Sequence, residues 1–325
     1  MKRTLSWMIG LGLIVGTTYA DGYLWLSAGG ETPTPRLYRF NLRTAQIDHT
    51  LTPNFVTSGN LPTEYGYLAY DGQSLYIGAN NRKAVARVNP YTGVVQQITA
   101  YNMCECFFGH HWMRDGAFKD GEFWRASPPH NPSQQFSVLM MADRHHIPEL
   151  MRYAYTLNFA TIGAEWVGEH LYLTTPRQFV RAEFDPDSDY TFTPVFYTLT
   201  GVPEGHTLGG LAYDADSGTL YLASRSATEV TIWALQVNDN TQTAQAEPVA
   251  TLHDKGYPAG AYPASMGWVP AIPGDVDGNG CTDDSDLLSV LFAFGSNSAQ
   301  QDLNRDGTVD DADLLIVLFN FGSGC

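Results

Sequence analysis

Two acidic segments near the C-terminus repeat the same order of oxygen-bearing side chains. The first runs from Asp275 to Asp286 and the second from Asp302 to Asp313. In both segments, Asp or Asn stands at positions 1, 3, 5, 9 and 12, and Gly stands at position 6. Calcium takes six to eight oxygen ligands around a tight turn, and glycine permits that turn. The spacing therefore predicts two calcium ions, one in each loop.

The expected ligands follow from these positions, with position 7 contributing its backbone carbonyl. In the first loop they are Asp275, Asp277, Asn279, Cys281, Asp283 and Asp286. In the second loop they are Asp302, Asn304, Asp306, Thr308, Asp310 and Asp313. A chance run of acids accounts for one such match, but two matches in register with matching flanks are typical of a calcium-binding repeat.

A near copy of one helix follows each loop, with the sequences DLLSVLFAFG and DLLIVLFNFG. Turn-forming residues precede both loops, so no helix leads into either of them. Loop-then-helix repeats of this kind resemble the type I dockerin family, and the resemblance covers Pro273 to Gly322. It implies two calcium ions, stability that depends on them, docking onto a cohesin module, and a place in polysaccharide breakdown.

The repeated helix is apolar nearly all round, which leaves two interpretations open. Either the two helices bury their apolar residues against each other, or an exposed remainder forms a docking face.

Cys281 and Cys325 flank the module, and we predict a disulfide that joins the first loop to the C-terminus. Such a bond stabilises a small domain by roughly 2–4 kcal/mol.

Residues 1–20 have the pattern of an export signal. Lys2 and Arg3 precede a mostly apolar run from Leu5 to Val15, and the segment ends in the small residue Ala20. The run is too short for a transmembrane helix, and no second run of spanning length follows. We therefore expect a secreted or cell-surface protein whose mature chain begins near residue 21, with no membrane span.

The charge composition of the chain limits the classes of partner that it can bind. The chain has 18 Lys and Arg against 34 Asp and Glu, a net charge of −16. This balance excludes nucleic acid as the main partner, because binding phosphates needs a basic surface. Ten Asp and one Arg fall within residues 271–325. We therefore divide the mature chain into a body, residues 21–270, and a calcium-binding tail, residues 271–325.

The body repeats a unit of four strands about every 45–57 residues. Three segments align around an inner hairpin and a Leu-Tyr-Ile or Leu-Tyr-Leu strand, at residues 75–77, 171–173 and 220–222. Repeats of this length with four strands each predict an all-β propeller. We count five blades, with the first closed by strands from both ends of the body, and six blades stay open as an alternative.

Candidate site residues in the body fall into two groups that one face of a propeller would bring together. Acids and imidazoles lie on the loops that lead into inner strands, namely Glu64, His110, His111, Glu204 and His206. Guanidinium groups lie on the turns between second and third strands, namely Arg36, Arg82, Arg177 and Arg225. A site for a glycan or uronate uses such groups as base and carboxylate clamp. We favour structural roles for them, since no motif determines their geometry.

Cys104 and Cys106, followed by His110 and His111, allow a zinc or copper site. A disulfide between the two cysteines is the alternative in an oxidising compartment. No nucleophile elbow, phosphate-binding loop or dinucleotide motif is present in the sequence.

The leading hypothesis is an exported propeller that binds a glycan or protein and is tethered through a dockerin-like tail. The alternatives are a polysaccharide hydrolase or lyase, and a structural protein of a surface or matrix.

Overall fold

The computed structural model describes residues 21–28, 36–52, 65–79, 84–100, 115–127, 137–143, 154–157, 161–184, 192–258, 261–263 and 265–325. The signal segment, Glu64, Arg82, Cys104, Cys106, His110 and His111 lie outside these residues. Within them the body is almost entirely β, with one short 3₁₀ turn, η1 (His253–Lys255). The mostly β architecture predicted from the sequence is confirmed.

The strands of the described residues form five antiparallel units of four, each ordered from an inner to an outer strand. The first unit is β20 (Met266–Pro270), β1 (Gly22–Ala28), β2 (Arg36–Asn41) and β3 (Gln46–Leu51). The second is β4 (Tyr65–Tyr70), β5 (Leu75–Ala79), β6 (Ala84–Val88) and β7 (Val95–Ala100). The third is β8 (Asp115–Lys119), β9 (Glu122–Ser127), β10 (Ser137–Asp143) and β11 (Ala154–Leu157).

The last two units share one eight-stranded sheet. The fourth is β12 (Ala164–Val167), β13 (His170–Thr174), β14 (Phe179–Phe184) and β15 (Phe192–Thr200). The fifth is β16 (Thr207–Asp214), β17 (Thr219–Arg225), β18 (Val230–Asn238) and β19 (Thr243–Thr251). Their outer strands β15 and β19 pair in parallel over three residues, which joins the two units at the rim.

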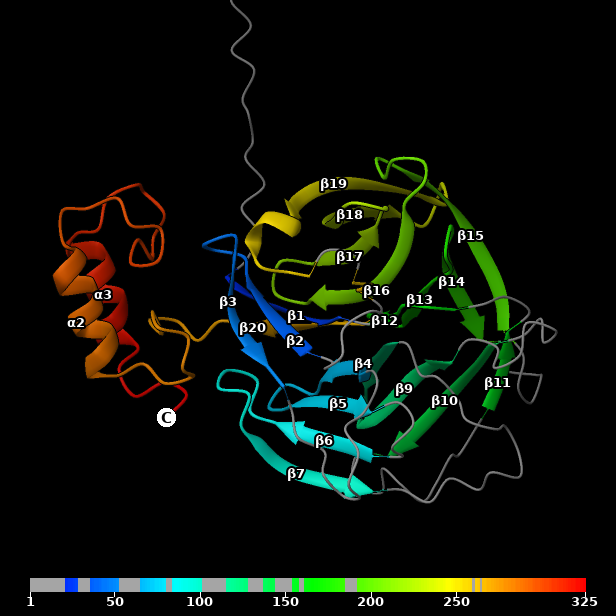
Figure 1. The fold of residues 1–325 in the computed structure, drawn as a ribbon, viewed down its shortest axis with the longest axis horizontal. Coiled ribbons are helices and arrows are strands. Elements are labelled where there is room, and N and C mark those ends of the chain that lie inside the picture. The colour runs from blue at the N-terminus through cyan, green and yellow to red at the C-terminus, as the bar shows by residue number, and fades with distance from the viewer. Residues whose placement is uncertain are drawn as a thin grey trace, which may run out of the picture.

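The five inner strands close a ring. β20 contacts β4, and contacts then run from β4 to β8, β12, β16 and back to β20. Figure 1 shows these strands around the centre and β3, β7, β11, β15 and β19 at the outside. The arrangement is propeller-like. The first unit takes β20 from the end of the body and β1 from its start, as predicted, and the two strands pair antiparallel.

The repeated Leu-Tyr motif is buried because each unit packs between two others. In an exposed sheet, alternate residues of a strand face water, but here all nine positions are at most 5% exposed. The nine are Leu75, Tyr76, Ile77, Leu171, Tyr172, Leu173, Leu220, Tyr221 and Leu222. Complete burial of such side chains contributes roughly 1.5–3 kcal/mol each, so the space between units is the main core.

Aspartate side chains stabilise the turns of two predicted inner hairpins. Asp71 accepts hydrogen bonds from the backbone N–H groups of Gln73 and Ser74, at 2.9 and 2.7 Å. Asp214 makes the same pair of bonds to Asp216 and Ser217. A carboxylate that satisfies two turn amides stabilises the turn itself. These acids therefore have a structural role.

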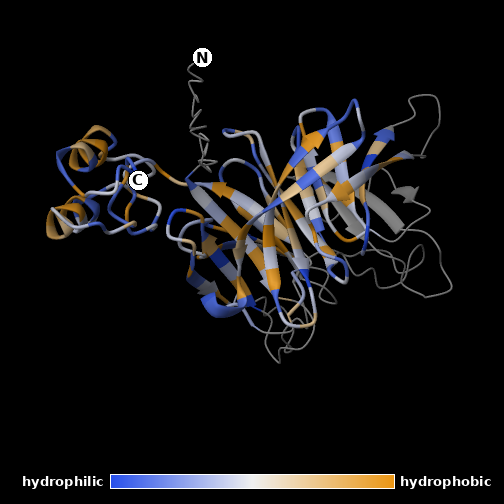
Figure 2. Ribbon diagram, turned by 90° about the horizontal axis from the view of Figure 1, so that it is seen from above, coloured by the Kyte–Doolittle hydropathy of each residue, from blue (hydrophilic) through white to orange (hydrophobic). Residues whose placement is uncertain are grey.

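The tail holds two helices, α2 (Asp284–Ala293) and α3 (Asp311–Phe319), each directly after an acidic loop. Asp283 and Asp310 are their N-caps, and both helices have a reciprocal capping box. A small core, made of Val276, Val290, Leu303, Val309 and Val317, holds the two repeats together. Cys281 and Cys325 are joined in a disulfide, with their Cα atoms 4.7 Å apart. Figure 2 shows apolar residues along both helices.

Arg39 of β2 links the body to the first loop of the tail. Its Nη1 donates to the carbonyl oxygens of Gly278 and Tyr91, at 2.8 and 2.7 Å. Its Nε pairs with Asp48 at 2.7 Å, and the guanidinium lies 4.3 Å from the centroid of the Tyr23 ring. The side chain is almost fully buried. A second contact joins Arg305 of the other loop to Asp21.

Among the described residues, no helix is both long and apolar enough to cross a membrane.

Candidate functional site

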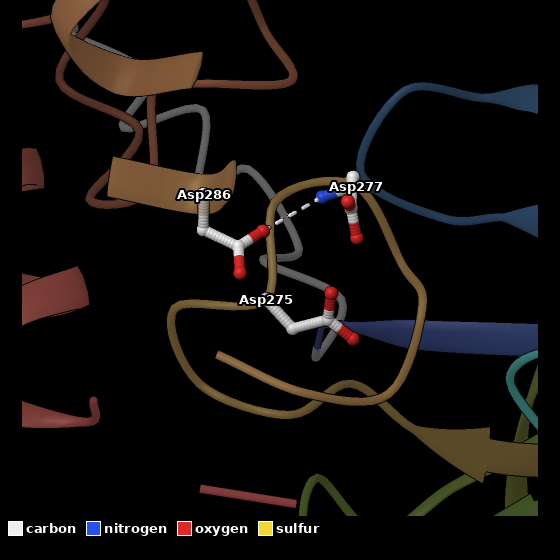
Figure 3. Close-up of side chains that lie close together, drawn as sticks. All are labelled: Asp275, Asp277 and Asp286. Carbon is white, nitrogen blue, oxygen red and sulfur yellow. Dashed lines mark hydrogen bonds between the residues drawn. The ribbon is translucent and has the colours of Figure 1, made fainter. Parts of the chain in front are cut away.

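The first acidic loop brings three predicted ligands together. Carboxylate oxygens of Asp275, Asp277 and Asp286 all lie within 4.8 Å of one another (Figure 3). Asp275 and Asp286 are buried, whereas Asp277 is exposed. Three carboxylates at this separation repel one another unless a cation lies between them. Oxygen donors from carboxylates are the ligands that calcium prefers, so this donor set fits the ion.

Backbone amides hold the two buried acids in place. Asp275 accepts hydrogen bonds from the N–H groups of Gly278, Asn279 and Gly280. Asp286 accepts from Val276, Asp277 and Asp283, and so ties the start of α2 to the start of the loop. The turn between them passes through Gly280 at a φ of +93°, a conformation that favours glycine.

Electrostatics at this site favour a bound cation. Burial raises the pKa of Asp275 to about 6, and the charges of Asp286 and Asp277 add to the effect. Hydrogen bonds from Gly280 and Gly278 oppose it without cancelling it. A divalent cation reverses this balance, because it stabilises the ionised form of every carboxylate around it.

The second loop repeats the arrangement with one difference. Asp313 accepts from Leu303, Asn304 and Asp310, as Asp286 does in the first loop. Asp302 accepts one bond from Gly307 through Oδ2. Its other oxygen, Oδ1, is buried and has no hydrogen-bond partner. A buried oxygen without a partner costs free energy, and a bound cation would relieve that cost.

The structure separates ligand roles that the sequence grouped together. Asp283 and Asp310 serve as helix caps, because each accepts from the second amide of the following helix. Asn304 and Asp306 contact each other through Nδ2 and Oδ2 at 2.9 Å. In the described part of the chain, three carboxylates within 4.8 Å occur only in the first loop. The side chains of both loops fit calcium. The first loop has three carboxylates close together, and the second has a buried Asp302 oxygen without a hydrogen-bond partner.

Three of the predicted body residues line one pocket of about 470 Å³, which we call the surface pocket. Arg177 comes from the turn between β13 and β14, while Glu204 and His206 come from the loop that leads into β16. Arg36 and Arg225 do not line it. The predicted convergence of acid, imidazole and guanidinium is therefore present for one pair of neighbouring units.

His206 belongs to a short chain of hydrogen-bonding groups. The indole N–H of Trp233 donates to Ser224 Oγ at 2.8 Å, and this oxygen lies 2.8 Å from His206 Nδ1. Nε2 of His206 faces Glu229 at 3.7 Å. These contacts hold the imidazole at the wall of the surface pocket.

Sequence reasoning missed a second pocket on the axis of the ring, which we call the axial pocket. It has a volume of about 310 Å³ and takes wall residues from all five inner strands. These include Tyr70, Phe118, Glu165, Tyr213 and Trp268. Burial raises the pKa of Glu165 well above its ordinary value, and the nearby charge of Asp115 adds to this. Nothing in the local sequence distinguishes Glu165, since its surroundings come from distant strands.

Asp115, at the start of β8, is the second axial carboxylate. Its Oδ2 accepts from the backbone N–H groups of Ala164 and Leu211, at 3.1 and 3.0 Å. Its Oδ1 accepts from Ser265 Oγ at 2.8 Å and from the N–H of Met266 at 3.3 Å. One fully buried side chain thus joins β8 to β12, β16 and β20. With both oxygens engaged twice, Asp115 has a structural role.

Comparison with known proteins finds no family model that matches this chain and no match among curated proteins. Solved structures do match. A chain of a nidogen–laminin complex is 9% identical, covers 76% of this chain and 98% of its own length, and has a TM-score of 0.41.

Two further structures match at a similar level. A luciferin-regenerating enzyme is 13% identical, with 71% and 76% of the two chains covered and a TM-score of 0.41. The β-propeller domain of Cps50 (Swd1) from Myceliophteria thermophila is 11% identical, with 70% and 82% covered and a TM-score of 0.35. Nothing about the activity of this chain follows from similarities this low.

Proposed function

We propose that this chain is an exported calcium-binding protein whose five-bladed propeller binds a glycan or protein and is tethered through its dockerin-like tail. The tail would dock onto a cohesin-like module in a polysaccharide-degrading or cell-surface assembly. Calcium, when bound, supplies the positive charge that holds the carboxylates of each loop together. The chain's own residues cap the helices, order the loops and present the docking face.

One observation carries this proposal: the two tail helices expose matched apolar side chains. Eight of the ten large apolar residues that are exposed in the described part of the chain lie in or directly after α2 and α3. They form four pairs at the 27-residue repeat, namely Leu288 with Leu315, Leu291 with Leu318, Phe292 with Phe319, and Phe294 with Phe321. Phe292 and Phe319 are 87% and 83% exposed. Contiguous exposed apolar residues mark interaction sites.

The way the tail sits on the body supports the same interpretation. Arg39 holds the first loop through the Gly278 carbonyl, so the loops and not the helices meet the propeller. Figure 1 shows both helices on the side of the tail away from the sheets. A partner therefore reaches the apolar face while the tail stays attached to the body.

A carbohydrate-active enzyme is the second candidate, and the surface pocket favours it. Arg177 suits the carboxylate of a uronate, and Glu204 is the acid available in the same pocket. The imidazole of His206 lines the same pocket and offers a hydrogen-bonding group to a substrate. A binding role for this pocket needs no further residue, so we place catalysis second.

The test is capture of the full chain by a panel of cohesin modules fixed to a sensor surface. We expect capture in calcium, loss of capture in a chelator, and loss in the double variant Phe292→Ala and Phe319→Ala. The matched control is Phe196→Ala, which removes a half-exposed phenylalanine of the body and should leave capture unchanged. No capture by any cohesin in calcium, or full capture of the double variant, would overturn the docking proposal.

A further inference from the structure

The axial pocket contains a carboxylate with no counter-charge. Glu165 Oε1 accepts from the backbone N–H of Trp166 at 2.9 Å, and the backbone of Tyr213 also donates to this carboxyl group. Among the described residues, no Lys, Arg or His lines the pocket. Lys119, the lysine of β8, pairs with Glu169 at 2.7 Å. Glu165 is half-buried, and a carboxylate partly withdrawn from water is costly to ionise unless a ligand supplies a positive charge.

Aromatic rings make up much of the wall around Glu165. Tyr70, Phe118 and Tyr213 end or nearly end their inner strands. Trp268 lies in the middle of β20, so four inner strands bring these rings to one pocket. Trp166, which also lines the pocket, already has the Nζ of Lys119 4.5 Å from its ring centroid. Faces of aromatic rings attract cations electrostatically, most strongly where water is excluded.

Two alternative ligand classes fit this pocket poorly. An anion such as a uronate or phosphate would meet the charges of Glu165 and of Asp216 at the rim, with no basic residue among the described lining. A metal ion needs several free oxygen donors, but both oxygens of Asp115 are engaged by hydrogen bonds. One carboxylate with aromatic walls instead suits a singly charged organic cation.

We propose that the axial pocket binds a small organic ammonium ion, with Glu165 as its counter-charge and the rings of the inner strands as its walls. The site lies in the body, apart from the calcium loops, and is independent of cohesin docking. A volume of about 310 Å³ is at the lower end for ligand pockets, so the ligand is a small amine and not a polymer.

Three probes that share one carbon frame test the role of charge. We would titrate the full chain with 2-phenylethylammonium, 2-phenylethanol and phenylacetate by calorimetry, with saturation-transfer NMR alongside. The ammonium should bind at least about tenfold more tightly than the alcohol, and the carboxylate should not bind. Equal affinities for ammonium and alcohol would overturn the proposal. So would absence of binding by both 2-phenylethylammonium and the smaller butylammonium.

Variants test the position of the site. Glu165→Gln keeps the shape and the acceptor oxygen but removes the charge, so ammonium binding should fall to the level of the alcohol. Asp120→Asn, which neutralises an exposed acid of the β8–β9 turn outside the pocket lining, is the matched control and should bind normally. Ala215→Trp at the rim should block the pocket without altering the core. Unchanged ammonium binding in Glu165→Gln or in Ala215→Trp would show that the ion binds elsewhere.

Discussion

Asp115 shows how one buried side chain can take the place of backbone hydrogen bonds between neighbouring inner strands. Inner strands of successive units do not share a backbone ladder, so other groups must satisfy their inward-facing amides. The carboxylate of Asp115 accepts four hydrogen bonds from donors on three different elements. A carboxylate suits this role because both of its oxygens accept hydrogen bonds. A side-chain amide would instead present its N–H₂ to two of the donors.

At this residue we predict that Asp115→Asn destabilises the body by about 1–3 kcal/mol, the cost of leaving buried donors unpaired. Urea unfolding of the body, followed by tryptophan fluorescence, measures the change. Asp120→Asn is the control, since Asp120 is exposed in the β8–β9 turn at a φ of +53°, which Asn tolerates. An Asp115→Asn protein as stable as the wild type would refute the bridging role.

Glu165 predicts a pH dependence of stability. Burial raises its pKa in the folded state, so the folded chain keeps the proton to a higher pH than the unfolded chain does. Stability from this group is therefore complete below the unfolded pKa, about 4.3, and is lost as pH rises through the folded pKa. Glu165→Gln has no such loss, so its melting temperature should gain on the wild type with rising pH. Parallel melting curves from about pH 4 to pH 8 would contradict this.

At the scale of the element, the inner strand β16 depends on two adjacent glycines. Its register with β17 shifts between Leu208 and Leu211, where Gly209 and Gly210 form a bulge. A Cβ on Gly210 would lie 2.6 Å from the backbone nitrogen of Met266, and one on Gly209 would lie 2.3 Å from the carbonyl oxygen of Pro263. The bulge thus lets β16 approach the segment before β20 and helps to close the ring.

We predict that Gly210→Ala destabilises the body by about 2–4 kcal/mol, because the atoms it meets are backbone and cannot move aside. Gly267→Ala on β20 is a graded control, since its nearest neighbours are leucine side-chain atoms at 3.3 and 3.4 Å. Thermal unfolding of both variants gives the comparison. Similar small losses in the two would mean that the close approach at Gly210 is not needed.

The elements were more predictable than the sites they form. The Leu-Tyr strands and the closing of the first unit by strands from both ends of the body follow the four-strand repeat, and the structure confirms them. The axial pocket follows no local pattern, because its wall residues come from five inner strands that are spread along the chain between Ala69 and Pro270. The sequence also left undecided which face of α2 and α3 is exposed, since a helix that is apolar all round does not show which side packs.

At the scale of the whole molecule, Arg39 joins the first acidic loop to the propeller-like body. The same side chain holds Asp48 and Tyr91 of the body and Gly278 of the loop. A contact that orders the loop favours the conformation that binds the ion, and by linkage the ion favours the contact. We therefore expect the Arg39 contact and bound calcium to strengthen each other.

Replacing Arg39 should break this coupling. In Arg39→Ala we expect the first calcium site to weaken on the order of tenfold while the second is unchanged. The segment 271–275 should also become cleavable by protease. Arg87→Ala is the matched control, because Arg87 holds the corresponding place in β6 but is exposed. Calcium affinities that stay equal in all three proteins would contradict the coupling.

The most direct test of the account is a calorimetric calcium titration of the full chain, repeated with Asp286→Asn and Asp313→Asn. We predict two ions per chain in the wild type and one in each variant, since each acid organises one loop. No calcium binding by the wild-type chain would contradict the account, because the acidic loops would then be a solvated tail and the docking proposal would lose its basis.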